Sequence, residues 1–253
     1  MRQKGAEQNM SKKKLIGFIV LFTAVWTLTP FVTSSHGYIY SAPLSSAQKA
    51  IALTFDDGPG EYTEKLLDGL KKENAKVSFF LLGKQAEKHP ETIERIYNDG
   101  HFIGNHTYSH TSLFETNTKN FIHDLKKSED IIKNITGSDV LFFRPPHGFY
   151  TGRRLNKIDR IAILWSNDPA DWKNTDCEYV CSYLLEHAED GKIFLLHDTK
   201  ESTVDGVLKA IPLLKKQGFE FLRADELLCR NGDALRCGLA YRMCKKDMKP
   251  LYF

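Results

Sequence analysis

The chain lacks the signatures of several common protein classes. None of its five cysteines belongs to a CxxC pair, so the cysteines indicate no zinc site. No internal repeat is apparent, and no glycine-rich phosphate turn follows the first strand-like segment. The formal net charge is +3, but residues 1–14 alone carry +4, so the remainder carries −1. A body so close to neutral has no electrostatic footprint for nucleic acid, and we expect no nucleic-acid partner.

The N-terminal region carries the one long uncharged run of the chain. A basic segment, residues 1–14, precedes residues 15–32, which contain no charged side chain. This pattern predicts either a cleaved signal peptide or a membrane anchor, and Ser35-His36-Gly37 offers small residues at a cleavage spacing. In both cases the basic segment stays cytoplasmic and the body is exported to the periplasm, the cell envelope or the outside, anchored in the cytoplasmic membrane if residues 15–32 are retained. The Ser-rich residues 33–48 are expected to be a linker.

The cysteines all lie late in the chain, at Cys177, Cys181, Cys229, Cys237 and Cys244. An exported chain permits disulfides, and an odd count leaves at least one cysteine unpaired within a monomer. We therefore predict at least one disulfide in the C-terminal tail, residues 229–253. The alternative, thiols packed as small apolar groups, suits Cys177 and Cys181 at their helical spacing better than it suits the polar tail.

Residues 49–228 alternate between short apolar runs and amphipathic segments. With 253 residues and 42% hydrophobic content, the chain suits one sizeable domain. The apolar runs predict parallel strands buried on both faces, and the amphipathic segments predict helices between them. The expected strands are 51–56, 76–83, 101–104, 140–143, 160–165, 192–196 and 220–222; the expected helices are 62–74, 90–99, 119–135, 152–159, 176–188 and 204–216. About seven such strands predict an α/β fold, a closed or nearly closed barrel. An open doubly wound sheet is less favoured because the first turn is Asp-Asp-Gly-Pro.

Two acids stand at the end of the first predicted strand. Asp56 and Asp57 precede Gly58-Pro59, which stops the strand. Adjacent carboxylates repel, so the pKa of one should rise unless a cation or hydrogen-bond donors hold both ionised. A solvated turn would explain this dipeptide taken alone. Four later segments supply the missing partners.

The next such segment contains two histidines. His106 and His110 follow the predicted strand 101–104, and four-residue spacing would project both imidazoles to the same side of a helical turn. With Asp57 they make two imidazoles and one carboxylate, a typical catalytic metal sphere with open positions. The HxxxH pattern alone is weak evidence.

Three further segments also follow predicted strands. Pro145 and Pro146 fix the backbone after Arg144; Asp171-Trp172 follows the strand 160–165; and His197-Asp198 follows the strand 192–196. In a barrel, function collects on the loops at the carboxyl ends of the strands, where all these polar groups fall. His197 would supply a second titratable group opposite the metal, as hydrolysis needs to protonate a leaving group.

In this order the five segments resemble a known family. TFDDGP (54–59), HTYSH (106–110), RPPHG (144–148), DPADW (168–172) and LLHD (195–198) look like the five motifs of the polysaccharide deacetylase family, the NodB-homology domain of carbohydrate esterase family 4. The resemblance covers residues 49–228. It implies a distorted (β/α) barrel and metal-dependent removal of N-acetyl groups from amino-sugar polymers.

The resemblance also implies roles for single residues. Asp57, His106 and His110 match the metal ligands of the family, and Asp56 matches the catalytic base, which Arg144 orients. His197 matches the catalytic acid, and Asp171 matches the carboxylate that tunes this acid. The backbone amide of His147, preceded by Pro146, matches the oxyanion donor, while Trp172 and Leu195 match the walls of the slot for the acetyl methyl. His147 departs from the family, whose members often carry tyrosine there, and this puts its side-chain contacts to the sugar in doubt.

The sequence leaves several alternatives open. One divalent ion is expected, zinc first, although cobalt, nickel and iron also accept this ligand set. The substrate is expected to be an N-acetylated glycan such as peptidoglycan, a chitin oligomer or an exopolysaccharide, and the protein is expected to be a monomer. A hydrolase of another amide and a non-catalytic glycan-binding module are the competing functions. A non-catalytic module would be expected to carry at least one damaged motif. All five motifs are intact, so this alternative is disfavoured.

Overall fold

The computed structural model describes residues 32–34, 37–42, 45 and 48–244. The basic segment and residues 15–31 lie outside these ranges, so the signal peptide or anchor stays a prediction from the sequence. Among the described helices, none combines the length and the apolar character that crossing a membrane requires.

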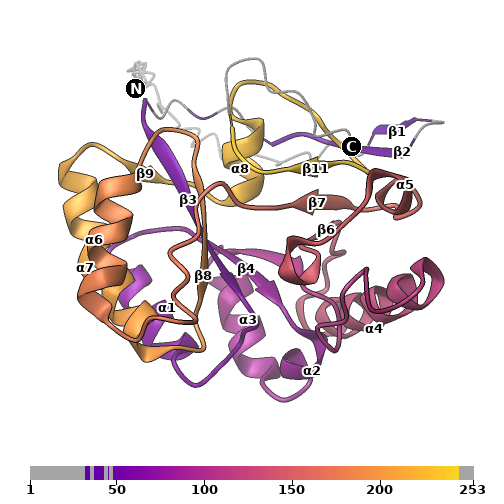
Figure 1. Ribbon diagram of the computed structural model, residues 1–253, viewed down its shortest axis with the longest axis horizontal. Helices are drawn as coiled ribbons and strands as arrows, with labels where there is room; N and C mark the ends of the chain where they lie inside the picture. The colour runs from indigo at the N-terminus through magenta and orange to yellow at the C-terminus, as the bar shows by residue number, and fades with distance from the viewer. Residues whose placement is uncertain (1–31, 35–36, 43–44, 46–47, 245–253) are drawn as a thin grey trace, which may run out of the picture.

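A curled, mostly parallel sheet forms the centre of the molecule (Figure 1). Its strand order is β11-β7-β6-β5-β4-β3-β8, with β9 paired to β3, and every one of these pairings is parallel. The strands are β3 (Ala50–Asp56), β4 (Ser78–Leu81), β5 (Phe102–Asn105), β6 (Phe142–Phe143), β7 (Ile161–Ile163), β8 (Ile193–His197), β9 (Glu220–Phe221) and β11 (Ala240–Tyr241). The seven strands predicted from the sequence are all present, and the parallel arrangement is confirmed.

The sheet curls far enough for its two ends to approach each other. Beyond β7, Asn167 forms a parallel bridge with Phe194 of β8, and Lys192 forms an antiparallel bridge with Met243 just beyond β11. The amide of Leu195 donates to the carbonyl of Asn167 at 2.9 Å. These contacts connect β8, at one end of the sheet, to the segments that follow β7 and β11 at the other end. The distorted barrel expected from the sequence is confirmed.

Strand β3 is buried along its whole length, and its two faces differ. Ile51, Leu53 and Phe55 belong to a large apolar cluster that includes residues of helices α1, α3, α6 and α7. Ala50 and Ala52 belong to a second cluster, together with residues of β4 to β8 and of α8. Because side chains alternate along a strand, Thr54 and Asp56 share the face of these two alanines. Small residues on this face leave room for polar groups inside the barrel.

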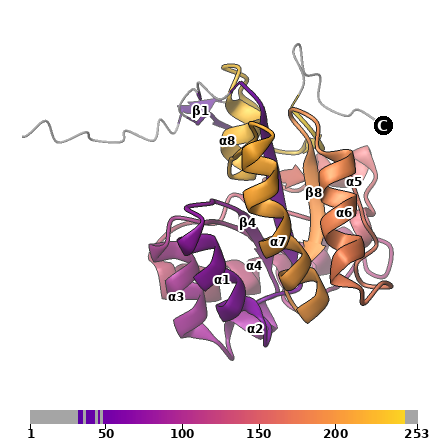
Figure 2. The ribbon, with the colours of Figure 1, turned by 90° about the vertical axis from the view of Figure 1, so that its left-hand side faces the viewer.

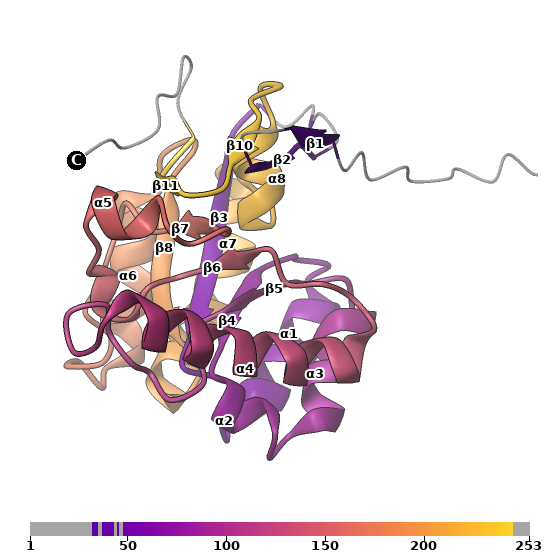
Figure 3. The same ribbon diagram turned by 90° about the vertical axis from the view of Figure 1, so that its right-hand side faces the viewer.

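Helices cover the outside of the barrel. Figures 1 and 2 show α6 and α7 side by side next to β8, and Figure 3 shows α4 on the side of β5 and β6. Helix α4 is capped at both ends: Asn117 accepts from the amide of Asn120, and Gly137 adopts a left-handed φ of 73°. The helices are α1 (Thr63–Lys72), α2 (Gly83–Ala86), α3 (Pro90–Asn98), α4 (Thr118–Thr136), α5 (Gly152–Leu155), α6 (Cys177–His187), α7 (Glu201–Lys216), α8 (Ala224–Cys229) and the 3₁₀ turn η1 (Pro146–Gly148).

The structure differs from the sequence-based expectation at both ends of the predicted domain, before residue 49 and after residue 228. The end of the expected signal or anchor segment and the start of the expected linker form β1 (Val32–Ser34). The linker also contributes β2 (Gly37–Tyr40), which pairs with β10 (Leu235–Arg236) from the expected tail. The tail also supplies β11, which extends the main sheet. Tyr40 further donates to Asp225 at 2.6 Å. Short pairings between distant segments carry little sequence signal, because only the folded barrel brings their partners together.

The predicted disulfide is not formed: no bond joins any two of the five cysteines, all of which are described. Cys229 and Cys244 are instead buried in the second apolar cluster. The sequence of the tail is polar, but the pairing of β10 with β2 and of β11 with β7 holds the tail against the rest of the fold. Cys229 and Cys244 are therefore buried and pack as small apolar side chains.

Candidate active site

The polar motifs meet in one pocket at the carboxyl end of the barrel. This pocket has a volume of about 590 Å³. Residues from all five motifs line it, together with three residues outside the motifs, Trp165, Thr199 and Lys200. The lining residues from the motifs are Asp56, Asp57, His106, His110, His147, Asp168, Trp172, Leu195 and His197. Parallel strands bring their carboxyl ends to one edge, and this is why segments 140 residues apart in sequence come together.

Asp57, His106 and His110 form a compact cluster. Oδ1 of Asp57 lies 3.6 Å from Nε2 of His106 and 3.5 Å from Nε2 of His110. The helical turn expected for residues 106–110 is wrong: these residues form no helix, and the left-handed φ of His110, 62°, turns its ring toward His106. The two rings lie edge to face at 5.0 Å. Asp57 is also left-handed, with φ of 70°, and this separates its direction from that of Asp56.

This cluster fits a divalent cation. Oδ1 of Asp57 is buried, and among the described residues no hydrogen-bond partner reaches it. Nδ1 of His106 lies 2.8 Å from the carbonyl of Arg144, an arrangement that directs Nε2 toward Asp57. Burial lowers the pKa of His106 to about 3, which keeps its imidazole neutral, the form that binds metal. A carboxylate and two imidazoles converging on one point could hold such an ion.

Arg144 crosses the barrel interior to reach Asp56. Its guanidinium is completely buried and donates to Oδ1 of Asp56 at 2.7 Å, to the hydroxyl of Thr54 at 2.8 Å, and to the carbonyls of Ile163 and Leu164. Burial raises the pKa of Asp56 above its ordinary value, although Arg144 opposes this shift. Oδ1 is thereby held by Arg144, while Oδ2 lies 3.7 Å from Nε2 of His106 and lines the pocket.

His197 pairs with Asp56 on the neighbouring strand, and Asp171 holds its ring. Oδ1 of Asp171 lies 2.8 Å from Nδ1 of His197, and Oδ2 accepts from the His197 amide and from the hydroxyl of Thr203. Burial alone would lower the pKa of His197, but the hydrogen bond and charge of Asp171, with Asp56 and Asp57 beyond, raise it to about 9. Nε2 points into the site, 4.0 Å from Oδ2 of Asp57.

The remaining expected site residues divide into two groups. His147, Trp172 and Leu195 line the pocket; His147 has a left-handed φ of 60° in η1, and Leu195 lies on β8. Pro146 is buried at the start of η1 and is not among the residues that line the pocket.

Four further residues line the pocket although the sequence indicated no role for them: Trp165, Asp168, Thr199 and Lys200. Each lies within two residues of a recognised motif or strand end, and that proximity was the available signal. Asp198 ends the fifth motif, and the sequence indicated no role for it either. It is fully buried, accepts from the hydroxyl of Thr63, and burial raises its pKa to about 7.

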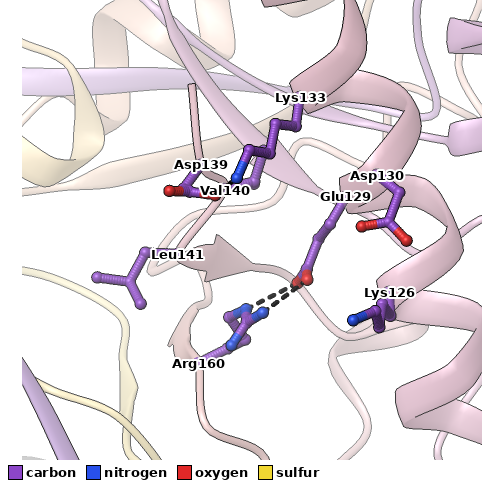
Figure 4. Close-up of a pocket in the computed structure, with 8 residues that line it drawn as sticks. All are labelled: Lys126, Glu129, Asp130, Lys133, Asp139, Val140, Leu141 and Arg160. Carbon is purple, nitrogen blue, oxygen red and sulfur yellow. Dashed lines mark hydrogen bonds and ion pairs between the residues drawn. The ribbon is translucent and has the colours of Figure 1, made fainter. Parts of the chain in front are cut away.

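A second pocket, of about 310 Å³, lies beside α4 near the amino ends of β6 and β7 (Figure 4). Arg160 donates to both carboxylate oxygens of Glu129, at 2.8 and 2.7 Å, and Lys133 pairs with Asp139 at 2.7 Å. The bidentate pair of Arg160 with Glu129 joins α4 to the segment that leads into β7.

Comparison with known proteins agrees with this geometry. Residues 44–163 match the family described as Polysaccharide deacetylase. A peptidoglycan-N-acetylglucosamine deacetylase of Bacillus cereus is 38% identical over 77% of this chain and 73% of its own length. The peptidoglycan-N-acetylmuramic acid deacetylase PdaC of Bacillus subtilis is 34% identical over 71% of this chain, which spans only 39% of that protein.

Solved structures show the same fold. T48 deacetylase, solved with substrate, superposes with a TM-score of 0.73 at 35% identity, over 76% of this chain and 96% of its own. A family 4 acetyl xylan esterase from Clostridium thermocellum, in complex with a cobalt ion, superposes with a TM-score of 0.68 at 31% identity, over 73% of this chain and 92% of its own. The chain belongs to the polysaccharide deacetylase family and is a hydrolase of carbohydrate esterase family 4.

Proposed function

We propose that the protein is an exported deacetylase that hydrolyses the N-acetyl groups of amino sugars in a cell-wall glycan. The observation that carries this proposal is that Asp56 and His197, which are paired on neighbouring strands, line the same pocket as Asp57. Oδ2 of Asp56 lies 3.7 Å from Nε2 of His106, and Nε2 of His197 lies 4.0 Å from Oδ2 of Asp57, so both groups adjoin the candidate cation site. One group accepts a proton and the other supplies one, as amide hydrolysis requires.

Asp57, His106 and His110 would hold the divalent ion. When bound there, the ion would polarise the acetamide carbonyl and lower the pKa of water. Zinc is proposed as the resident ion, because two imidazoles and one carboxylate form a common catalytic zinc sphere. Cobalt, nickel and iron fit the same ligands, and metal analysis separates them.

Asp56 is proposed to act as the base. Arg144 holds Oδ1 in the barrel interior, so only Oδ2 is left to accept a proton from the attacking water. That water oxygen forms the new bond to the acetyl carbon. The negative charge that develops on the carbonyl oxygen would be stabilised by the backbone amide of His147, a residue that lines the pocket and has a left-handed φ.

His197 is proposed to act as the acid. Its raised pKa keeps the imidazole protonated near neutral pH, and Asp171 fixes the ring so that Nε2–H faces the site. As the C–N bond breaks, this proton passes to the departing nitrogen, and the products are acetate and a free amino sugar. Leu195 and Trp172 would enclose the acetyl methyl between them.

The decisive experiment measures acetate released by the metal-loaded full chain. Peptidoglycan and oligomers of N-acetylglucosamine serve as substrates, and the Asp56→Asn variant serves as the inactive control. We expect release from glycan in the wild type and about 10³-fold less in the variant. Analysis of the product sugars distinguishes glucosamine from muramic acid, the two products that the names of the relatives suggest.

Two results would overturn this proposal. Glycan binding without acetate release from any glycan would indicate a binding module. Hydrolysis confined to small non-sugar amides would indicate a different amide hydrolase.

A further inference from the structure

Two phenylalanines lie exposed next to the pocket. Phe114 is 64% exposed and Phe149 is 52% exposed, and their rings meet edge to face with centroids 5.3 Å apart. Neither residue is among those that line the pocket, and the proposed chemistry uses neither of them. An exposed pair of large apolar rings in mutual contact needs an explanation, whereas single exposed apolar residues do not.

The pair continues a row of rings that starts inside the pocket. His110 contacts His147 at 4.8 Å between centroids, His147 contacts Phe149 at 5.7 Å, and Phe149 contacts Phe114. The row therefore runs outward from the candidate cation site. A polymer with one sugar at the pocket would extend its neighbouring sugars over surface of this kind.

The loop that carries Phe114 is held in place by a buried neighbouring side chain and by hydrogen bonds. Leu113 is completely buried, and the hydroxyl of Ser112 accepts from the amide of Phe114 at 3.1 Å. Arg154 of α5 donates to the hydroxyl of Thr118 at 3.0 Å and to the carbonyl of Thr116 at 2.5 Å. The exposed position of Phe114 thus belongs to an anchored loop.

We propose that Phe114 and Phe149 form a stacking platform for a second sugar ring of the glycan, next to the sugar whose acetamide reacts. A pyranose ring presents apolar C–H faces and polar edges. Aromatic rings offer a large apolar surface at low conformational cost, so they can cover one such face while the hydroxyls stay in water. The platform rests on the proposed function for its substrate class, and it determines which oligomer lengths are processed well.

Oligomers of N-acetylglucosamine from one to five sugars provide the test. For the metal-loaded wild type we expect kcat/KM to rise with length. In the Phe114→Ala/Phe149→Ala variant the rise should be lost, with about a tenfold lower kcat/KM on the five-sugar oligomer, carried mainly by KM, and a much smaller change on the single sugar. Phe149→Trp should retain the length dependence. Tyr97→Ala removes an aromatic ring that is 43% exposed at the C-terminal end of α3, away from the pocket, and should leave the length dependence as in the wild type.

Binding to the Asp56→Asn variant, measured by calorimetry, separates this proposal from the proposed function. The wild type could fail to hydrolyse any oligomer while the Asp56→Asn variant still binds the five-sugar oligomer. If the two alanine substitutions, added to Asp56→Asn, then weaken this binding about tenfold, the platform is supported and the deacetylase assignment fails. Equal binding and equal kinetics with and without both phenylalanines would overturn the platform. A second result would also overturn the platform: the wild type forms a dimer, the double variant is a monomer, and their kinetics are equal. The two rings would then serve self-association.

Discussion

The carboxylate of Asp198 lies directly against Gly58, so closely that a β-carbon on Gly58 would come 2.5 Å from Oδ1 of Asp198. Gly58 follows the two acids of the first motif, and Asp198 follows the proposed acid of the fifth. The contact therefore connects the turn that carries Asp56 and Asp57 to the end of β8. Thr63 strengthens this connection, since its hydroxyl donates to Asp198 and accepts from the amide of Gly60.

Gly58→Ala should destabilise the protein by about 1–3 kcal/mol, since the new methyl group overlaps a buried carboxylate. Acetate release should fall as well, because relief of the overlap displaces Asp57. In an Asp198→Ala background the same substitution should cost less, since the smaller side chain leaves room. Urea unfolding of the four proteins measures this coupling, and strictly additive effects would contradict the contact.

Asp57→Ala and His110→Ala should each lower metal content and turnover together. Three protein ligands cannot spare one, and loss even of an outer partner typically costs about 10–100-fold. Elemental analysis of the purified variants gives the metal content, and His123→Ala, an exposed histidine on α4, is the matched control. Full metal occupancy with normal turnover in either variant would contradict the ligand assignment.

His197→Ala should leave the metal bound and the fold intact while turnover falls by about 10²–10⁴, the usual range for one general acid. Asp171→Asn should act in the same direction, because an amide no longer supports the raised pKa of His197, and the alkaline limb of the pH–rate profile should move to lower pH. Parallel metal analysis is essential. If His197→Ala released the metal, His197 would be a ligand and the roles proposed for the three histidines would have to be redrawn.

His101 should make the fold sensitive to acid. This buried histidine accepts from the amide of Val77 through Nδ1 at 3.3 Å, and burial lowers its pKa to about 4 from an ordinary 6.5. Between these two values the unfolded chain binds more protons than the folded one, so stability is lost as pH falls from 6.5 toward 4. At pH 5 the loss should be about 2 kcal/mol relative to pH 7.5.

Unfolding of the wild type and of His101→Gln at both pH values tests this expectation. The variant should show a flatter pH dependence, and exposed His123→Gln should keep the wild-type slope. Equal slopes in all three proteins would show that His101 is not the titrating group.

The barrel architecture, and the meeting of the polar motifs at one edge of the sheet, could be predicted from the amino-acid sequence. Apolar runs such as FFLL at 79–82 and IFLL at 193–196 are too uniformly apolar for a half-exposed sheet, so they require burial on both faces. Since parallel strands place their carboxyl ends at one edge, Asp57, His106 and His197 could be expected to meet even though they lie far apart in the chain.

The way in which these groups face one another could not be predicted, because it depends on backbone turns in the folded barrel. Two left-handed residues, Asp57 and His110, direct the candidate ligands, where a helical turn was expected around His110. The pairing of β11 with β7 and the contact between Phe114 and Phe149 likewise join segments that no local pattern connects. Local periodicity reports which face of a segment is buried, but the partner on that face is chosen by packing and backbone turns across the whole barrel.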